Sequence, residues 1–163
     1  MSPAGLGAAA AVLTIAADQA SKEWVLGRLA VEGSLGRGQV EVVTGFMNLV
    51  PVWNRGVSFG LFAADAQVMR WALTLVAVAV SIGLVIWLRR ARHGLLGLGL
   101  GLVIGGAIGN AIDRVRHGAV FDFLDLHAAG YHWPAFNVAD AGITVGVIAL
   151  LADGLFGRRE GHT

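Results

Sequence analysis

The stretch from Asn110 to Asp140 reads NAIDRVRHGAVFDFLDLHAAGYHWPAFNVAD, a polar cluster between two long apolar segments. Four aspartates fall in it: Asp113, Asp122, Asp125 and Asp140. A carboxylate at the edge of hydrocarbon is costly, so such residues in a membrane protein usually serve a function. We therefore expect this stretch to hold the functional site.

The composition of the chain is typical of a membrane protein. Its 163 residues are 56% hydrophobic and only 14% charged, which does not suit a soluble globular domain. Glycine, at 24 residues, is as abundant as in closely packed membrane helices. A net charge of +1 gives no basic field for nucleic acid, and the absence of cysteine excludes disulfides and thiolate chemistry. We expect one membrane-embedded domain, 1–163, without a nucleic-acid partner.

The apolar segments predict transmembrane helices, each of which needs about 20 residues to cross a bilayer. The expected helices are 4–24, 69–88, 95–114 and 136–156. Met1 to Gly7 contains no Lys or Arg, so we interpret the first segment as a retained helix rather than a signal peptide. The predicted fold class is mainly α, a polytopic membrane protein with four transmembrane helices.

Two segments are expected to lie outside the helices on the same side, 25–68 and 115–135. The first holds alternating stretches at 39–44 and 46–53 with Gly45 between them, which predicts a small β-sheet. This sheet, a cradle between helices one and two, is expected at the membrane surface.

Arginines fix the predicted orientation. They cluster in the 89–94 hairpin and after 157, beside helix ends. The positive-inside rule then places the hairpin and both termini in the cytoplasm, and the sheet on the extracytoplasmic side. Within helix three, Gly101, Gly105 and Gly109 recur every four residues, a stripe that favours close helix packing.

This topology brings polar residues of three helices to the extracytoplasmic side. These residues are Asp18 and Lys22, then Asn110, Asp113 and Arg114, then Asn137 and Asp140. Two neighbouring aspartates share a proton and can activate water for attack on an amide carbonyl. Asp122 and Asp140 are the best candidates, since apolar neighbours of Asp122 would raise its pKa and Asp140 begins a spanning helix. Asp113 is expected to pair with Arg114, and Asp125 to be solvated.

Other functions are compatible with these residues. A metal site could use the hard or borderline ligands Asp122, Asp125, His127 and His132, but no familiar ligand spacing is present, and none is expected. Serine catalysis lacks a recognisable motif at Ser21 or Ser58. The main alternative is a small transporter or proton/ion relay subunit using Asp18, Lys22 and Asp140. A structural scaffold is the third hypothesis, with Asp18 and Lys22 as an interfacial ion pair.

Four motifs in order resemble lipoprotein signal peptidase (signal peptidase II), a family of bacterial membrane aspartyl proteases. They are Asp18-Gln-Ala-Ser-Lys22, Asn54-Arg-Gly-Val-Ser-Phe59, Gly109-Asn-Ala-Ile-Asp-Arg114 with Gly118-Ala-Val-Phe-Asp-Phe123, and Phe136-Asn-Val-Ala-Asp140. The match covers nearly the whole chain. Val57 stands where the family often has alanine.

The resemblance implies a function and its residues. It implies catalytic aspartates at Asp122 and Asp140, and removal of the signal peptide from a diacylglyceryl-modified prolipoprotein just before the lipidated cysteine. Residues implied to support the site are Asn54, Gly56, Asn110, Arg114, Asn137, Ala139, Asp18, Lys22 and Asp113. It implies no metal and no organic cofactor. A monomer in the bacterial inner membrane, in contact with lipid, is expected, and the loop 54–60 is expected to cover the site.

Overall fold

The computed structural model describes all residues except 33–34, 57–65 and 157–163. Four helices and four strands make up the described part. The helices are α1 (Pro3–Arg28), α2 (Ala66–Leu88), α3 (Gly94–His117) and α4 (Val138–Phe156). The strands are β1 (Glu41–Thr44), β2 (Met47–Asn54), β3 (Val120–Ala128) and β4 (Tyr131–His132). The molecule is mainly helical, as predicted.

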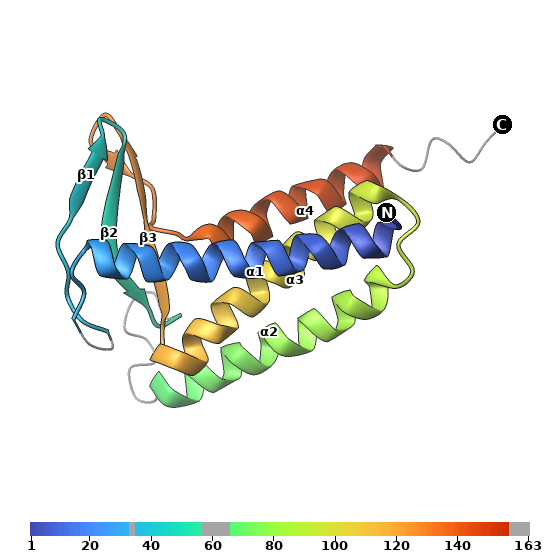
Figure 1. The fold of residues 1–163 in the computed structure, drawn as a ribbon, viewed down its shortest axis with the longest axis horizontal. Helices are drawn as coiled ribbons and strands as arrows, with labels where there is room; N and C mark the ends of the chain where they lie inside the picture. Colours follow the sequence, from blue (N-terminus) through green and yellow to red (C-terminus); the bar gives the residue numbers. More distant parts are fainter. Residues whose placement is uncertain (33–34, 57–65, 157–163) are drawn as a thin grey trace.

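The helices form a bundle with α3 packed between the others, and the sheet lies beyond one end of the bundle (Figure 1). The N-terminus, the α2–α3 turn and the end of α4 lie together at the opposite end (Figure 1). In the described residues, α2, α3 and α4 are long and apolar enough to cross a membrane. The 26-residue α1 is not among them. Its C-terminal half carries Asp18, Lys22 and Glu23, which lower its hydropathy.

Glycines let α3 approach its neighbours closely. A Cβ on Gly101 or Gly105 would lie 2.1 and 2.7 Å from backbone oxygens of α1, and one on Gly109 would lie 2.7 Å from Asp18 Oδ2. A Cβ on Gly106 would meet the backbone of α4 at Ala139, 2.3 Å away. Contacts this short are open only to glycine, so the packing role predicted for the stripe is confirmed.

The sheet corrects the sequence prediction. Its order is β1-β2-β3-β4 with antiparallel neighbours, so only half of it comes from the segment between α1 and α2. The other half, β3 and β4, comes from the segment between α3 and α4, which was expected to be a connection. Strand β3 shows no alternation of apolar and polar residues in the sequence, because residues 120–123 are buried on both faces of the strand. Such strands have no polar side and cannot be recognised by alternation.

Candidate active site

Strand β3 positions Asp122 by alternation. Phe121 and Phe123, on either side of Asp122, pack into a core with Val25 of α1 and with Leu29, the residue that follows α1. Because successive side chains of a strand point to opposite faces, Asp122 faces away from this core. It is nevertheless only 2% exposed. The strand therefore buries a carboxylate on the face that looks toward α4.

The first turn of α4 positions Asp140. Asn137 precedes the helix, and its side-chain Oδ1 accepts a hydrogen bond from Asp140 N at 2.9 Å. In return Asn137 N donates to Asp140 Oδ2 at 3.3 Å. This reciprocal arrangement is a capping box, which satisfies two backbone donors that the helix itself cannot use. A carboxylate in this turn also interacts favourably with the positive end of the helix dipole.

Asn137 joins the two aspartates. Its Nδ2 donates to Asp122 Oδ1 at 2.7 Å, while its backbone N and Oδ1 both bond to Asp140. Asn110 of α3 adds a second link, because its Nδ2 donates to Asp140 Oδ1 at 2.8 Å and its Oδ1 accepts from Asn137 Nδ2 at 3.2 Å. The structure thus places Asp122 and Asp140 at one site with two amide side chains between them.

Strand β2 contributes Asn54, whose Nδ2 donates to Asp122 Oδ2 at 3.0 Å. The Oδ1 of Asn54 accepts from Gly56 N at 2.8 Å, so the amide is held from both ends. Gly56 has a φ of 81°, a left-handed conformation that glycine adopts without a steric penalty. Residues 57–60 of the expected covering loop lie outside the described residues.

Burial raises the pKa of Asp122 to about 6 from its usual 3.8. Desolvation is the largest cause, and the neighbouring charge of Asp140 acts in the same direction. The hydrogen bonds from Asn54 and Asn137 oppose it. A carboxyl group with this pKa exchanges its proton near neutral pH, as a general acid must.

A second buried polar cluster lies behind Asp122 and Asp140, the aspartate pair that is called the dyad below. Lys22 Nζ lies 2.8 Å from Asp18 Oδ2 and 2.7 Å from Asp113 Oδ2, and all three residues are buried. The expectation that Asp113 pairs with Arg114 is wrong, because adjacent helix positions face different directions. Arg114 instead donates to Asn110 O at 3.2 Å, from where its charge acts on both Asp122 and Asp140.

Asp125 is not the solvated residue that the sequence suggested. It is buried on β3, where Asn48 Nδ2 donates to its Oδ2 at 2.9 Å and His132 Nδ1 lies 2.9 Å from its Oδ1. The Asn48 hydrogen bond, followed by that of His132, holds the pKa of Asp125 below its usual value. His127 stacks on His132, with ring centroids 4.9 Å apart. Asp125 therefore ties β4 to the sheet.

Sequence reasoning missed two members of these clusters. Gln19 Nε2 lies within 3.3 Å of oxygens of Asp18, Asp113 and Gly109. The motif in α1 contained it, but no chemistry marked it. Asn48 had no signal at all. Among the described residues, no group of three or more His, Asp or Glu side chains is arranged to hold a metal ion.

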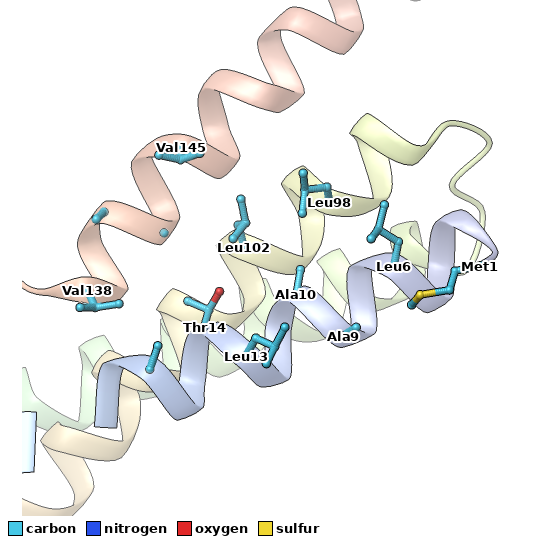
Figure 2. Close-up of a pocket in the computed structure, with 13 residues that line it drawn as sticks. Met1, Leu6, Ala9, Ala10, Leu13, Thr14, Leu98, Leu102, Val138 and Val145 are labelled. Atoms are coloured by element: carbon cyan, nitrogen blue, oxygen red, sulfur yellow. The ribbon is translucent and has the colours of Figure 1, made fainter. Parts of the chain in front are cut away.

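Two apolar hollows flank the first turns of α4. The larger, of about 640 Å³, lies between α1, α3 and α4 and is lined by side chains such as Leu13, Leu102 and Val145 (Figure 2). Its lining contains no carboxylate, so this hollow is not where the two aspartates lie. The second, of about 490 Å³, is lined by Trp133 and Phe136 and includes Asp140 itself. It provides an apolar surface directly beside the dyad.

Comparison with known proteins gives one consistent answer. Residues 10–156 match the family described as signal peptidase (SPase) II. A lipoprotein signal peptidase of Methylobacterium sp. (strain 4-46) is 49% identical over 161 residues, covering 99% of this chain and 95% of the relative. One from Methylobacterium radiotolerans is 50% identical over 155 residues, covering 95% of this chain and 88% of the relative.

Solved structures agree with these sequence matches. One described as a bacterial membrane enzyme, determined by the in meso method at 2.3 Å resolution, superposes with a TM-score of 0.74 at 27% identity. The superposition covers 98% of this chain and 94% of that one. The chain therefore belongs to the signal peptidase II family of bacterial inner-membrane aspartic proteases, which process lipoproteins.

Proposed function

We propose that this enzyme removes the signal peptide of diacylglyceryl-modified prolipoproteins, cutting before the lipidated cysteine with water activated between Asp122 and Asp140. The observation that carries the proposal is the Asn137 link, which bonds to both carboxylates at once. Two carboxyl groups held together in a buried site share a proton, as an aspartic protease requires. Family membership also disfavours the transporter and scaffold alternatives.

The burial of Asp122 favours different tasks for the two aspartates. Asp140, which accepts bonds from Asn110 and from the Asn137 backbone, is the partner that takes a proton from the attacking water. Asp122, whose pKa is raised to about 6, is the neutral partner.

The reaction then proceeds in two steps. Asp140 removes one proton from the water molecule while the oxygen of that water bonds to the scissile carbonyl carbon. The Asp122 carboxyl donates a hydrogen bond to the developing oxyanion. When the C–N bond breaks, the leaving amine takes up a proton from the dyad. One new carboxyl group and one new amine result, and the dyad is again singly protonated.

We propose that α1 is a fourth transmembrane helix and that the sheet end of the bundle faces the extracytoplasmic side. The arginine-rich α2–α3 turn, at the end opposite the sheet, supports this orientation. The dyad then lies at the outer edge of the bilayer. A diacylglyceryl group would remain in the membrane there, because each buried methylene contributes about 0.8 kcal/mol.

The hollow beside Asp140 is proposed to receive an apolar part of the substrate next to the scissile bond. Its lining by Trp133, Phe136 and Val145 matches an acyl chain or an apolar side chain of the signal peptide. The larger hollow shares Ala141 and Val145 with the hollow beside Asp140 and extends along α4 away from the sheet. Together they form a continuous apolar surface from the dyad into the bundle.

Cleavage by the purified monomer in detergent micelles tests the proposal. The substrates are one precursor peptide with and without the diacylglyceryl group on its cysteine. Mass spectrometry should find a single product that begins at the lipidated cysteine, with little product from the unmodified peptide. Equal cleavage of both peptides would contradict the proposed substrate class, and cleavage at another bond would contradict the proposed position.

A further inference from the structure

Lys22 is a charged side chain that the proposed chemistry does not use, although it is only 3% exposed. Its ammonium group has three protons and three acceptors, which are Asp18 Oδ2 at 2.8 Å, Asp113 Oδ2 at 2.7 Å and Asn110 Oδ1 at 3.3 Å. A buried ammonium is stable only when it is paired and fully hydrogen-bonded. Each of its three partners also forms a hydrogen bond with a catalytic aspartate or with the residue that precedes one.

The first two partners hold the backbone beside each catalytic aspartate. Asp18 Oδ1 accepts from Ala139 N at 2.9 Å, and Ala139 immediately precedes Asp140. Asp113 Oδ2 accepts from Phe121 N at 3.1 Å, and Phe121 immediately precedes Asp122. The two carboxylates paired with Lys22 therefore fix the backbone of β3 and of α4 one residue before the dyad.

The third partner sets the polarity of a side chain in the site. Lys22 can only donate, so it requires the oxygen of the Asn110 amide to face it, and Asn137 Nδ2, which donates to the same oxygen at 3.2 Å, favours the same orientation. The amide nitrogen must then face Asp140, to which it donates at 2.8 Å. With the opposite amide orientation, Asn110 would present an acceptor to the Asp140 carboxylate.

We propose that Lys22 is a positioning residue of the dyad, which fixes both the separation of Asp122 and Asp140 and the donor that Asn110 presents to Asp140. This inference rests on the proposed function. The charged groups around the dyad come from four elements: Asp18 and Lys22 of α1, Asp113 and Arg114 of α3, Asp122 of β3 and Asp140 of α4. Lys22 is the cation that contacts both supporting carboxylates directly.

The first test is Lys22→Met, with Arg28→Met as the matched control. Arg28 lies further along α1, nearer its C-terminus, and forms an exposed ion pair with Glu41. Displacing a catalytic group by about 1 Å can cost about 100-fold. We expect kcat to fall at least 100-fold in Lys22→Met with KM nearly unchanged, and a changed pH–rate profile. Wild-type kcat and pH profile in this variant would overturn the proposal, whereas Arg28→Met should behave as wild type.

Lys22→Met leaves Asp18 and Asp113 facing each other and can fail to fold, so Asn110→Asp provides an independent test. The new carboxylate is a better partner for Lys22 but turns an acceptor toward Asp140. We expect a folded protein that is inactive at neutral pH and regains part of its activity on acidification, when the new carboxyl can donate. Full activity at neutral pH, or no recovery at any pH, would refute the polarity argument.

These outcomes are distinct from a failure of the proposed function. If the wild-type enzyme does not cleave the lipidated precursor, the substrate assignment is wrong. If the wild type cleaves it and both variants match the wild type, only the positioning role of Lys22 is wrong.

Discussion

Asp122→Asn should make the protein inactive and, at alkaline pH, more stable. The wild-type carboxyl has its pKa raised from 3.8 to about 6 by burial, which corresponds to a preference of about 3 kcal/mol for the neutral form. Because the folded-state pKa is the higher one, this stability is fully present below pH 3.8 and is lost as the pH rises through about 6. At pH 8 the wild type therefore carries the whole penalty of a buried charge.

The amide variant avoids that penalty but loses a hydrogen bond. Asp122 accepts from both Asn54 and Asn137, and an amide has only one oxygen, so one contact costs about 1 kcal/mol. The net gain at pH 8 is about 2 kcal/mol. For a chain of this length it corresponds to a rise in Tm of about 4–8 °C. Near pH 3.5 the sign reverses, and the variant should be about 1 kcal/mol less stable.

Thermal unfolding in detergent across pH 3.5 to 8 measures this difference. The matched control is Glu23→Gln, which makes the same chemical change at an exposed ion pair with Arg116 and should move Tm little at any pH. If Asp122→Asn is no more stable than the wild type at pH 8, the Asp122 charge is not destabilising and the raised pKa is wrong.

Two further substitutions and the pH profile of the wild type test other parts of the structure. Gly109→Ala should abolish most activity, because its Cβ would lie 2.7 Å from Asp18 Oδ2, whereas Gly83→Ala on α2, with no atom near its Cβ among the described residues, should keep full cleavage. His132→Ala should lower Tm at neutral pH, because Asp125 loses a partner that holds its pKa down. The difference in Tm from the wild type should shrink below about pH 4, where Asp125 becomes protonated in both proteins, and a difference that stays constant with pH would contradict this. In the wild type, kcat/KM should fall above about pH 6 with the loss of one proton, and a flat profile to pH 9 would contradict a singly protonated dyad.

The sequence predicted the helical part of the fold well, because long apolar segments have few alternatives. It ended the first helix near residue 24, whereas α1 continues to Arg28 with its polar face buried in the bundle. Strand β3 was missed since its residues 120–123 are buried on both faces and show no alternation. The sequence therefore did not predict that β2 pairs with β3.

The prediction of the site was limited by what spacing reveals. Asp18 and Lys22, four residues apart, were correctly placed on one helix face, but spacing could not show that the pair is buried against α3. Asp113 and Arg114 are neighbours in sequence and not in the ion-pair network. Asp125 was misjudged because its partners, Asn48 and His132, come from other strands.

Single-turnover cleavage of the diacylglyceryl-modified precursor by Asp122→Asn and Asp140→Asn tests the two-aspartate mechanism most directly. Both variants should remain folded in detergent and bind the precursor, since each keeps the shape of the side chain. We expect each to lose at least 1,000-fold in rate, on the order of 4 kcal/mol of transition-state stabilisation. Cleavage at the wild-type rate by either variant would show that the two aspartates do not act as a catalytic pair.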